Sequence, residues 1–214
     1  MPVIILLLFI SFSFVAQADS TAIFRVDGVL SGPGGGPWGE GGTKIEPSGA
    51  SASFGSNFGV AAAVEVKVFN AVWVEFGVSR SDSVGLEIIR SHGIGNPFDT
   101  YNGKISVASY MLGVDFRPHE WEVGSALQYA LFAKYVSSQF GAPPPAAAVI
   151  LDTNAAGFCF GLRADYALHN SSWLVGMDFA FGGAAPTIAD PAANTSRKVE
   201  IGNFYLAVGP RFNF

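Results

Sequence analysis

Few side chains of this sequence stand at a spacing that suggests catalysis or metal binding. His169 and Ser171 form an H-x-S pair, and a serine nucleophile needs a neighbouring base together with a third group that orients the base. His92 and His119 have no partners at the spacing of a metal site. The single cysteine, Cys159, cannot form an internal disulfide, and we interpret it as a small buried or lumenal residue. We therefore expect no enzyme activity, no bound metal and no cofactor.

A glycine-rich segment, GPGGGPWGEGG at residues 32–42, has the composition of a phosphate-binding loop. It lacks the Lys-Ser/Thr ending of such loops, and no helical pattern follows it. We interpret the segment as an extracellular loop. The chain carries 12 basic and 17 acidic residues, a net charge of −5, so we expect no nucleic-acid partner.

The charged residues of most interest lie at alternating positions. In residues 157–168, GFCFGLRADYAL, bulky apolar side chains alternate with small or charged ones, and this period of two indicates a β-strand. Buried charges are tolerated chiefly when they are paired, and here six basic residues nearly balance seven acidic ones. We predict a lumenal network of salt bridges that comprises Arg25, Asp27, Glu65, Lys67, Glu75, Asp115, Arg117, Glu122, Lys134, Arg163, Asp165, Asp178 and Arg211.

Eight segments show the strand period: residues 22–30, 53–68, 72–82, 104–117, 121–136, 154–168, 173–181 and 198–214. Short connections at 69–71, 118–120 and 169–172 alternate with long ones at 31–52, 83–103, 137–153 and 182–197. Periplasmic turns and extracellular loops alternate in this way in outer-membrane barrels. The sequence therefore predicts an all-β fold, a closed eight-stranded antiparallel transmembrane β-barrel with short periplasmic turns and long extracellular loops.

A soluble barrel of the lipocalin kind has the same period, with its apolar face turned inward. Here the bulky residues crowd one face and the other face is rich in Gly, Ala and charge, which suits a narrow interior. Although 50% of the residues are hydrophobic, no apolar run beyond residue 18 approaches the length of a membrane helix. Lipid admits only helices and closed barrels. We therefore expect the chain to span the bacterial outer membrane and to contact its lipid.

The two ends of the chain also suggest export to this membrane. The apolar run VIILLLFISFSFVA precedes a small-x-small motif, AQA, so residues 1–18 are expected to be a signal peptide and residues 19–214 the barrel domain. At the other end, Phe212 and Phe214 lie on the outward side of the last predicted strand. A terminal Phe resembles the sorting signal of the bacterial barrel-assembly machinery, and we predict that both residues serve assembly. Because Pro210 cannot donate a ladder hydrogen bond, a bulge or frayed pairing is expected beside it.

Three stretches resemble the outer-membrane protein W (OmpW) family. Residues 70–81 (NAVWVEFGVSRS) are similar to its third strand, 107–118 (VASYMLGVDFRP) to its fourth, and 157–173 (GFCFGLRADYALHNSSW) to its sixth strand and turn. Residues 198–214 resemble its closing strand more loosely, and their ending GPRFNF departs from the family's usual aromatic-Arg-Phe. The resemblance implies an eight-stranded barrel with a narrow apolar channel for small hydrophobic compounds.

We therefore expect an outer-membrane barrel that forms a narrow channel or pathway for small hydrophobic molecules. Its outer half would be lined by Phe54, Phe58, Tyr135 and Phe158, and glycines near strand ends, at Gly55, Gly59 and Gly157, would permit a sideways exit into lipid. A structural or adhesive barrel with interacting extracellular loops is the alternative. A barrel enzyme is a weaker one: the H-x-S pair is similar to that of lipid A deacylases, but its predicted periplasmic turn lies away from the outer leaflet.

Overall fold

The computed structural model describes residues 22–32, 43–45, 50–90, 99–118, 122–123, 126–141, 153–168, 172–190, 195–198 and 204–213. The predicted signal peptide, the three histidines, Ser171 and Phe214 lie outside these residues. Within the described ranges, no helix has the length and apolar character needed to cross a membrane.

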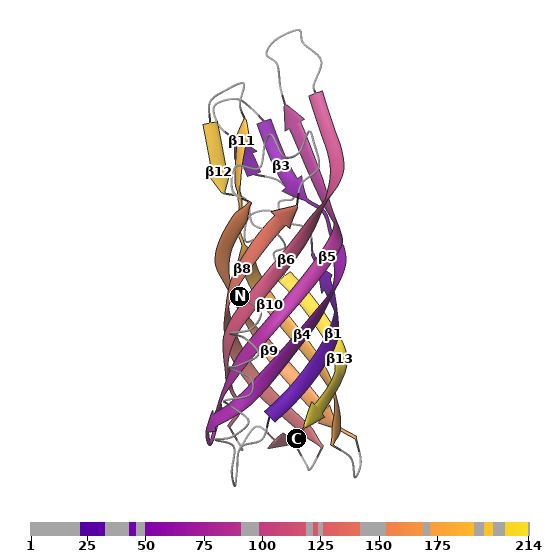
Figure 1. Ribbon diagram of the computed structural model, residues 1–214, viewed down its shortest axis with the longest axis vertical. Coiled ribbons are helices and arrows are strands. Elements are labelled where there is room, and N and C mark those ends of the chain that lie inside the picture. Colours follow the sequence, from indigo (N-terminus) through magenta and orange to yellow (C-terminus); the bar gives the residue numbers. More distant parts are fainter. Residues whose placement is uncertain are drawn as a thin grey trace, which may run out of the picture.

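Eight main strands close into an antiparallel barrel (Figure 1). They are β1 (Ala22–Ser31), β4 (Asn57–Phe69), β5 (Val72–Arg90), β6 (Asp99–Phe116), β8 (Leu127–Gly141), β9 (Asn154–Ala167), β10 (Trp173–Ala184) and β13 (Phe204–Asn213). Each strand pairs with the next, and the ring is closed by β1 against β13, where Phe24 faces Phe212. The predicted closed, eight-stranded, all-β fold is confirmed.

Among the described residues, five short strands lie outside this ring. They are β2 (Thr43–Ile45), β3 (Ala50–Phe54), β7 (Glu122–Val123), β11 (Thr187–Asp190) and β12 (Thr195–Lys198). Strand β3 pairs with the last part of β5, so that Phe54 faces Leu86. In Figure 1 the strands β3, β11 and β12 lie at the upper end of the barrel, together with the far ends of β5 and β6. We call this the extended end, and the opposite end, where the turn Asn70–Ala71 joins β4 to β5, the turn end.

Several predicted boundaries are wrong. Strand β5 runs to Arg90 and β6 begins at Asp99, so most of the loop predicted at 83–103 is a β-hairpin. The strand predicted from residue 121 begins at Leu127, because β7 folds back onto the start of β8 and places Val123 opposite Leu127. A tight reversal of this kind leaves the alternation of side chains intact, and the pattern alone therefore does not reveal it.

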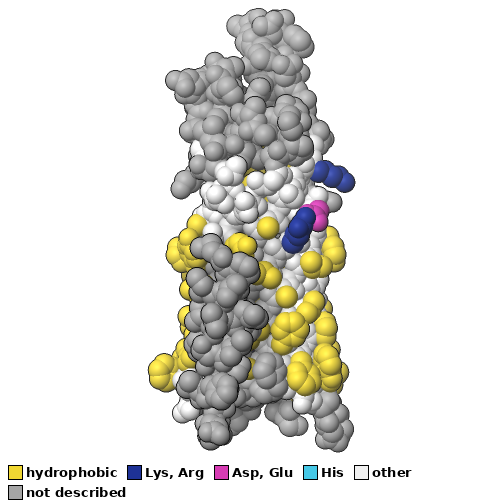
Figure 2. Space-filling view, viewed as in Figure 1, with side chains coloured by type: hydrophobic (Ala, Val, Ile, Leu, Met, Phe, Trp, Pro, Cys, Tyr) yellow, Lys and Arg dark blue, Asp and Glu magenta, His cyan; other side chains and the backbone are white. Residues whose placement is uncertain are grey.

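The side chains alternate across the barrel wall as the period of two predicts. In β9, Phe158 and Leu162 are exposed on the outside, whereas Cys159 and Arg163 are buried inside. Figure 2 shows hydrophobic side chains over the lower and middle parts of the barrel, with the visible charged side chains nearer the upper end. The inward positions hold the polar and charged groups, and the outward positions hold the apolar ones. A water-soluble barrel has the reverse arrangement, with its apolar face turned inward.

Aromatic side chains gather on the outer surface toward both ends. Near the turn end the exposed aromatic residues include Phe69, Phe116, Tyr129, Tyr166 and Trp173, and toward the extended end they include Phe58, Tyr110, Tyr135, Phe158, Phe160 and Phe181. Aliphatic residues such as Leu112, Leu131 and Leu162 are exposed between the two groups, together with Phe76 and Phe179. Aromatic girdles around an apolar band are typical of barrels that cross a membrane.

The expected irregularity beside Pro210 takes the form of an interrupted ladder. Strands β1 and β13 pair up to Arg25 and Arg211, and again from Gly28 and Val208, with the same register on both sides. No residue is inserted between these pairs, so there is no bulge. The missing N–H of proline accounts for the lapse in pairing, while the other neighbour, β10, stays paired and places Val175 opposite Pro210.

Candidate functional site

Charged side chains fill the barrel toward the turn end. Eleven of the thirteen residues predicted for this interior are at most 5% exposed. These eleven, which we call the charge network, are Arg25, Asp27, Glu65, Glu75, Asp115, Arg117, Lys134, Arg163, Asp165, Asp178 and Arg211. Lys67 is only partly buried and has no ion pair with a described residue. Glu122 lies in β7, and its side chain is outside the described part of the structure.

Arg163 of β9 stands at the centre of the charge network. Its Nε lies 2.7 Å from Oδ1 of Asp178, and its Nη2 lies 2.8 Å from Oε2 of Glu75. Its Nη1 lies 2.6 Å from Oε1 of Glu65 and also contacts Asp115. One guanidinium thus reaches four carboxylates that come from four different strands.

Two further cations share these carboxylates. Arg25 of β1 pairs with Glu75 and Asp178 through its two terminal nitrogens. The ammonium of Lys134, on β8, lies 2.9 Å from Oε1 of Glu75 and 3.4 Å from Oδ2 of Asp178. It also lies 4.3 Å from the ring centre of Phe132, a distance suited to a cation–π contact. Asp178 therefore meets cations from several directions.

The layer nearest the turn end is organised by Arg117 and Arg211. Arg117 donates to Asp165 at 2.8 Å and to Asp115 at 3.0 Å, contacts Glu65, and places its guanidinium 4.9 Å from the ring centre of Trp73. Arg211 donates to Asp178 at 2.7 Å and also contacts Asp165. Because a buried charge without a partner is costly, this pairing explains how so many ionised groups fit inside one barrel.

Glycines on the inward face make room for the long cationic side chains. A side chain at Gly176 of β10 would collide with the guanidinium of Arg211, and one at Gly113 of β6 would meet Cγ of Lys134 at 2.9 Å. The small residues that the sequence places opposite the bulky ones are therefore part of the packing of the network.

Three acidic side chains of the network, Glu65, Glu75 and Asp115, have carboxylate oxygens within 4.8 Å of one another, a grouping that can hold a metal ion. Each of them contacts the guanidinium of Arg163. The positive charge that such a cluster requires is therefore supplied by the protein itself, and we assign no metal to it.

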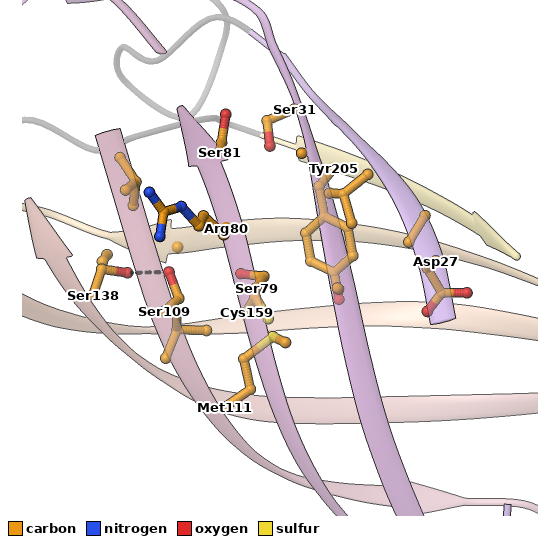
Figure 3. A pocket seen from close by; sticks show the side chains of 18 of the residues that line it. Asp27, Ser31, Ser79, Arg80, Ser81, Ser109, Met111, Ser138, Cys159 and Tyr205 are labelled. Carbon is orange, nitrogen blue, oxygen red and sulfur yellow. Dashed lines mark hydrogen bonds between the residues drawn. The ribbon is translucent and has the colours of Figure 1, made fainter. Parts of the chain in front are cut away.

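A cavity of about 120 Å³ lies between the charge network and the extended end. Asp27, Lys134 and Asp178 belong to the network and reach the cavity, as does Cys159. Hydroxyl and aliphatic side chains line the rest of it, among them Ser31, Ser79, Ser109, Ser138, Val29, Val107, Val136 and Met111. Figure 3 shows Ser109 and Ser138 joined by a hydrogen bond, which is 2.7 Å long, and Asp27 and Tyr205 on the wall of the same cavity.

The sequence-based prediction of the lining was partly wrong. Phe54 is buried inside the barrel, but Phe58, Tyr135 and Phe158 are exposed on its outer surface, because they share the outward parity of their strands. The serines that line the cavity were not predicted. Their signal was their place on the inward parity, in line with the charged residues on the same strands, such as Ser79 with Glu75.

The seam between β4 and β5 is interrupted beside the cavity. Strand β5 pairs with β4 as far as Arg80 and with β3 from Leu86 onward. Between these points, the Gly55 amide donates to the Gly85 carbonyl at 2.9 Å and the Ser81 hydroxyl donates to the Phe58 carbonyl at 2.8 Å.

Of the three glycines predicted at a weak point of the wall, Gly55 and Gly59 lie at this seam. Gly157 does not: it is paired to Val136 on one side and to Ala184 on the other. A side chain at Gly157 would collide with the carbonyl of Gly183, which shows how closely the neighbouring strands approach there.

Comparison with solved structures gives a clear result for the fold. The outer membrane protein OprG from Pseudomonas aeruginosa matches with a TM-score of 0.61 and 15% identity, over 91% of this chain and 96% of that one. The outer membrane protein AlkL matches with a TM-score of 0.53 and 17% identity, over 92% and 90%. The chain has the fold of an outer-membrane β-barrel.

The Escherichia coli outer membrane protein W matches with a TM-score of 0.48 and 11% identity, over 92% of this chain and 100% of that one. Comparison of the sequence with protein-family models gives no match, and neither does comparison with curated proteins. The likeness to OprG and AlkL is thus one of architecture: residues so different in type still produce the same closed barrel along nearly its whole length.

Proposed function

We propose that this chain is a bacterial outer-membrane barrel that provides a narrow pathway for small hydrophobic molecules. One observation carries the proposal: an internal cavity with many aliphatic lining residues lies toward the extended end, above a layer of paired charges that closes the other end. A molecule that enters from the extended end finds a small site but no continuous water-filled route beyond it.

The outer surface supports a location in the membrane. In β9, the exposed residues Phe158 and Tyr166 are eight positions apart, and in β10 the exposed residues Trp173 and Phe181 are also eight positions apart. Eight residues span about 26 Å at roughly 3.3 Å per residue. For a strand tilted by about 40°, this gives a height of about 20 Å, close to the apolar band of an outer-membrane barrel.

The size of the interior restricts the ligand. A barrel of eight strands leaves space chiefly for its own side chains or one small ligand, and the cavity of this chain has a volume of about 120 Å³. Crossing the charge network would oblige an apolar molecule to separate paired charges, at a cost of several kcal/mol per ion. We therefore propose that such molecules leave sideways, above the network.

The interrupted seam between β4 and β5 is our proposed point of exit. Gly59, Arg80 and Ser81 belong both to this seam and to the lining of the cavity. Between the two paired stretches the strands are bridged by the two hydrogen bonds at Gly55 and Ser81, so this part of the wall has fewer ladder bonds to break than a continuous pair of strands.

The test is uptake of a small apolar compound, such as radiolabelled toluene, by Gram-negative cells with and without the protein. Ser79 of β5 is directed into the cavity, and its neighbour Val78 is exposed on the outer surface. Ser79→Phe should therefore return the initial rate of uptake to that of cells without the protein, whereas Val78→Phe should leave it several-fold higher. Heat-dependent gel mobility would confirm equal amounts of folded barrel.

If the wild-type chain does not accelerate uptake, or if Ser79→Phe conducts as well as Val78→Phe, the pathway is refuted. Such a result would favour a structural or adhesive barrel. The extended hairpin of β5 and β6, which projects beyond the rest of the barrel in Figure 1, would then be the first surface to test for partners.

A further inference from the structure

The charge network leaves one carboxylate without a hydrogen bond. Glu65, Glu75, Asp115, Asp165 and Asp178 each accept at least one hydrogen bond from an arginine of the network. Asp27 is different: both of its oxygens are buried, and neither has a hydrogen-bond partner in the described part of the structure. A buried polar group without such a partner costs free energy, so this position calls for an explanation.

The distances around Asp27 show the same contrast. Its Oδ2 lies 3.4 Å from Nη1 of Arg25, and its Oδ1 lies 3.9 Å from Nη2 of Arg211. Both arginines make closer contacts with Asp178. Charge-assisted hydrogen bonds are normally 2.7–2.9 Å long, and the nearest cations are therefore already engaged elsewhere.

The charge network also contains more negative than positive groups. The buried network contains five cations, Arg25, Arg117, Lys134, Arg163 and Arg211, and six carboxylates, Asp27, Glu65, Glu75, Asp115, Asp165 and Asp178. One negative charge is thus in excess. The carboxylate that lacks hydrogen bonds belongs to a residue of the cavity wall, so the excess charge lies beside the cavity.

The remaining lining defines what kind of ligand fits. Lys134 and Arg25 also reach the cavity, but their nitrogens bind Glu75 and Asp178. The hydroxyl of Ser79 has no hydrogen bond with a described residue and can accept one from a ligand. Beyond these polar groups the wall is aliphatic, with Val29, Val107, Val136 and Met111.

From this juxtaposition we propose that the cavity binds a small organic cation, a primary alkylammonium whose head group pairs with Asp27 and whose short chain packs against the valines and Met111. A volume of about 120 Å³ suits a ligand on the order of five heavy atoms. The aliphatic wall favours such a ligand over an inorganic cation, which would leave that wall without contacts. This inference shares its cavity with the proposed pathway but concerns binding and does not require transport.

The test uses the full-length protein folded in detergent micelles and isothermal titration calorimetry. The probes are n-butylammonium, the neutral n-butanol, the anion n-butyrate and, in a separate arm, sodium and potassium chloride. We expect n-butylammonium to bind at least about tenfold more tightly than n-butanol, the gain expected of a hydrogen bond to a charged group. Butyrate and the inorganic cations should show no binding.

Asp27→Asn keeps the shape of the side chain and removes its charge. It should weaken n-butylammonium binding by at least about tenfold and leave n-butanol unchanged. The matched control is Glu87→Gln, which neutralises an exposed carboxylate on β5 and should change neither affinity. Equal affinities for n-butylammonium and n-butanol, or an unchanged affinity in Asp27→Asn, would overturn the proposal. Binding of potassium or sodium that competes with n-butylammonium would also overturn it, in favour of an inorganic cation site.

A second variant keeps the inference testable if Asp27→Asn does not fold. Ser79→Phe leaves Asp27 in place and fills the cavity, so it should abolish binding of both n-butylammonium and n-butanol. Retained n-butylammonium binding would place the site elsewhere and refute the proposal. Because these titrations do not involve uptake, a barrel that binds n-butylammonium but conducts nothing contradicts only the pathway. A barrel that conducts toluene but binds no n-butylammonium contradicts only this inference.

Discussion

At the scale of single residues, Arg163 and Asp178 show how charged side chains can be buried inside a narrow barrel. Arg163 reaches four carboxylates, and Asp178 accepts hydrogen bonds from Arg25, Lys134, Arg163 and Arg211. Arg163 and Asp178 therefore each pair with several residues of opposite charge. If either side chain is removed, several buried charges lose one of their partners. Asp27, by contrast, lies at longer distances from its cations.

The free energy of unfolding should therefore respond differently to loss of charge at the two aspartates. Asp178→Asn leaves four cations without a shared carboxylate and should lower the free energy of unfolding by about 3–5 kcal/mol, as expected when a buried pair is broken. Asp27→Asn removes a charge that the network does not neutralise, and the free energy of unfolding should stay within about 1 kcal/mol of wild type or rise. Urea unfolding in lipid vesicles measures both. A similar loss in the two variants would show that Asp27 is as well paired as Asp178.

Which residues face the interior could be predicted from the sequence, but which of them pair could not. The period of two places Arg163 and Asp165 on one side of a strand, and the structure buries both. The partners of Arg163, however, come from β4, β5, β6 and β10. Their meeting depends on the stagger of the strands around the ring, which no single segment of sequence records. The excess charge at Asp27 is likewise visible only once the pairs are known.

At the scale of elements, the strand cores could be predicted and their ends could not. Within the membrane band one face must be apolar, so the alternation is strict and β9 was predicted almost residue for residue. Beyond that band β5 and β6 continue as a hairpin to Arg90 and from Asp99. No lipid constrains the outward residues there, and the signal in the sequence fades although the backbone pairing continues.

Depth along a strand should control the cost of placing a charge on the outer surface. Leu162 is exposed near the middle of β9, and Leu162→Arg should lower the free energy of unfolding in lipid by about 2–4 kcal/mol. The control is Gln139→Arg, on the exposed outer face of β8 toward the extended end, where the cost should be about 0–1 kcal/mol. If Leu162→Arg is as stable as wild type while the inward variant Gly161→Arg fails to fold, then Leu162 does not face lipid.

At the scale of the whole molecule, the barrel has two unlike halves. The turn end is filled by the charge network and by Trp73, whereas the extended end holds the cavity and buried apolar side chains such as Phe54 and Leu86. The fold is shared with OprG along most of both chains. The layer that blocks the lumen, however, is formed by this chain's own inward-facing residues. This closed layer should block the passage of ions, and the ion current through the barrel can be measured directly.

The barrel should carry almost no ion current, because the layer of side chains across its interior is at most 5% exposed and eight strands leave no room for water beside it. In planar bilayers the wild-type protein should therefore show no steady steps, unlike a 16-stranded porin, whose lumen is an aqueous channel. Arg163→Ala combined with Asp178→Ala removes one cation and one carboxylate from the centre of the network and keeps the net charge. This double variant should open the layer and produce current steps.

Glu87→Ala combined with Lys104→Ala is the matched control, because it removes one exposed carboxylate and one exposed cation from β5 and β6, outside the charge network and the cavity lining, and keeps the net charge. It should remain as silent as the wild type. Large, steady currents through the wild-type barrel would mean that water and ions pass the charge network, and the proposed sideways exit would lose its physical reason. A folded Arg163→Ala, Asp178→Ala barrel that stays closed would instead show that the remaining side chains seal the lumen, so that closure depends on the number of strands and not on this pair.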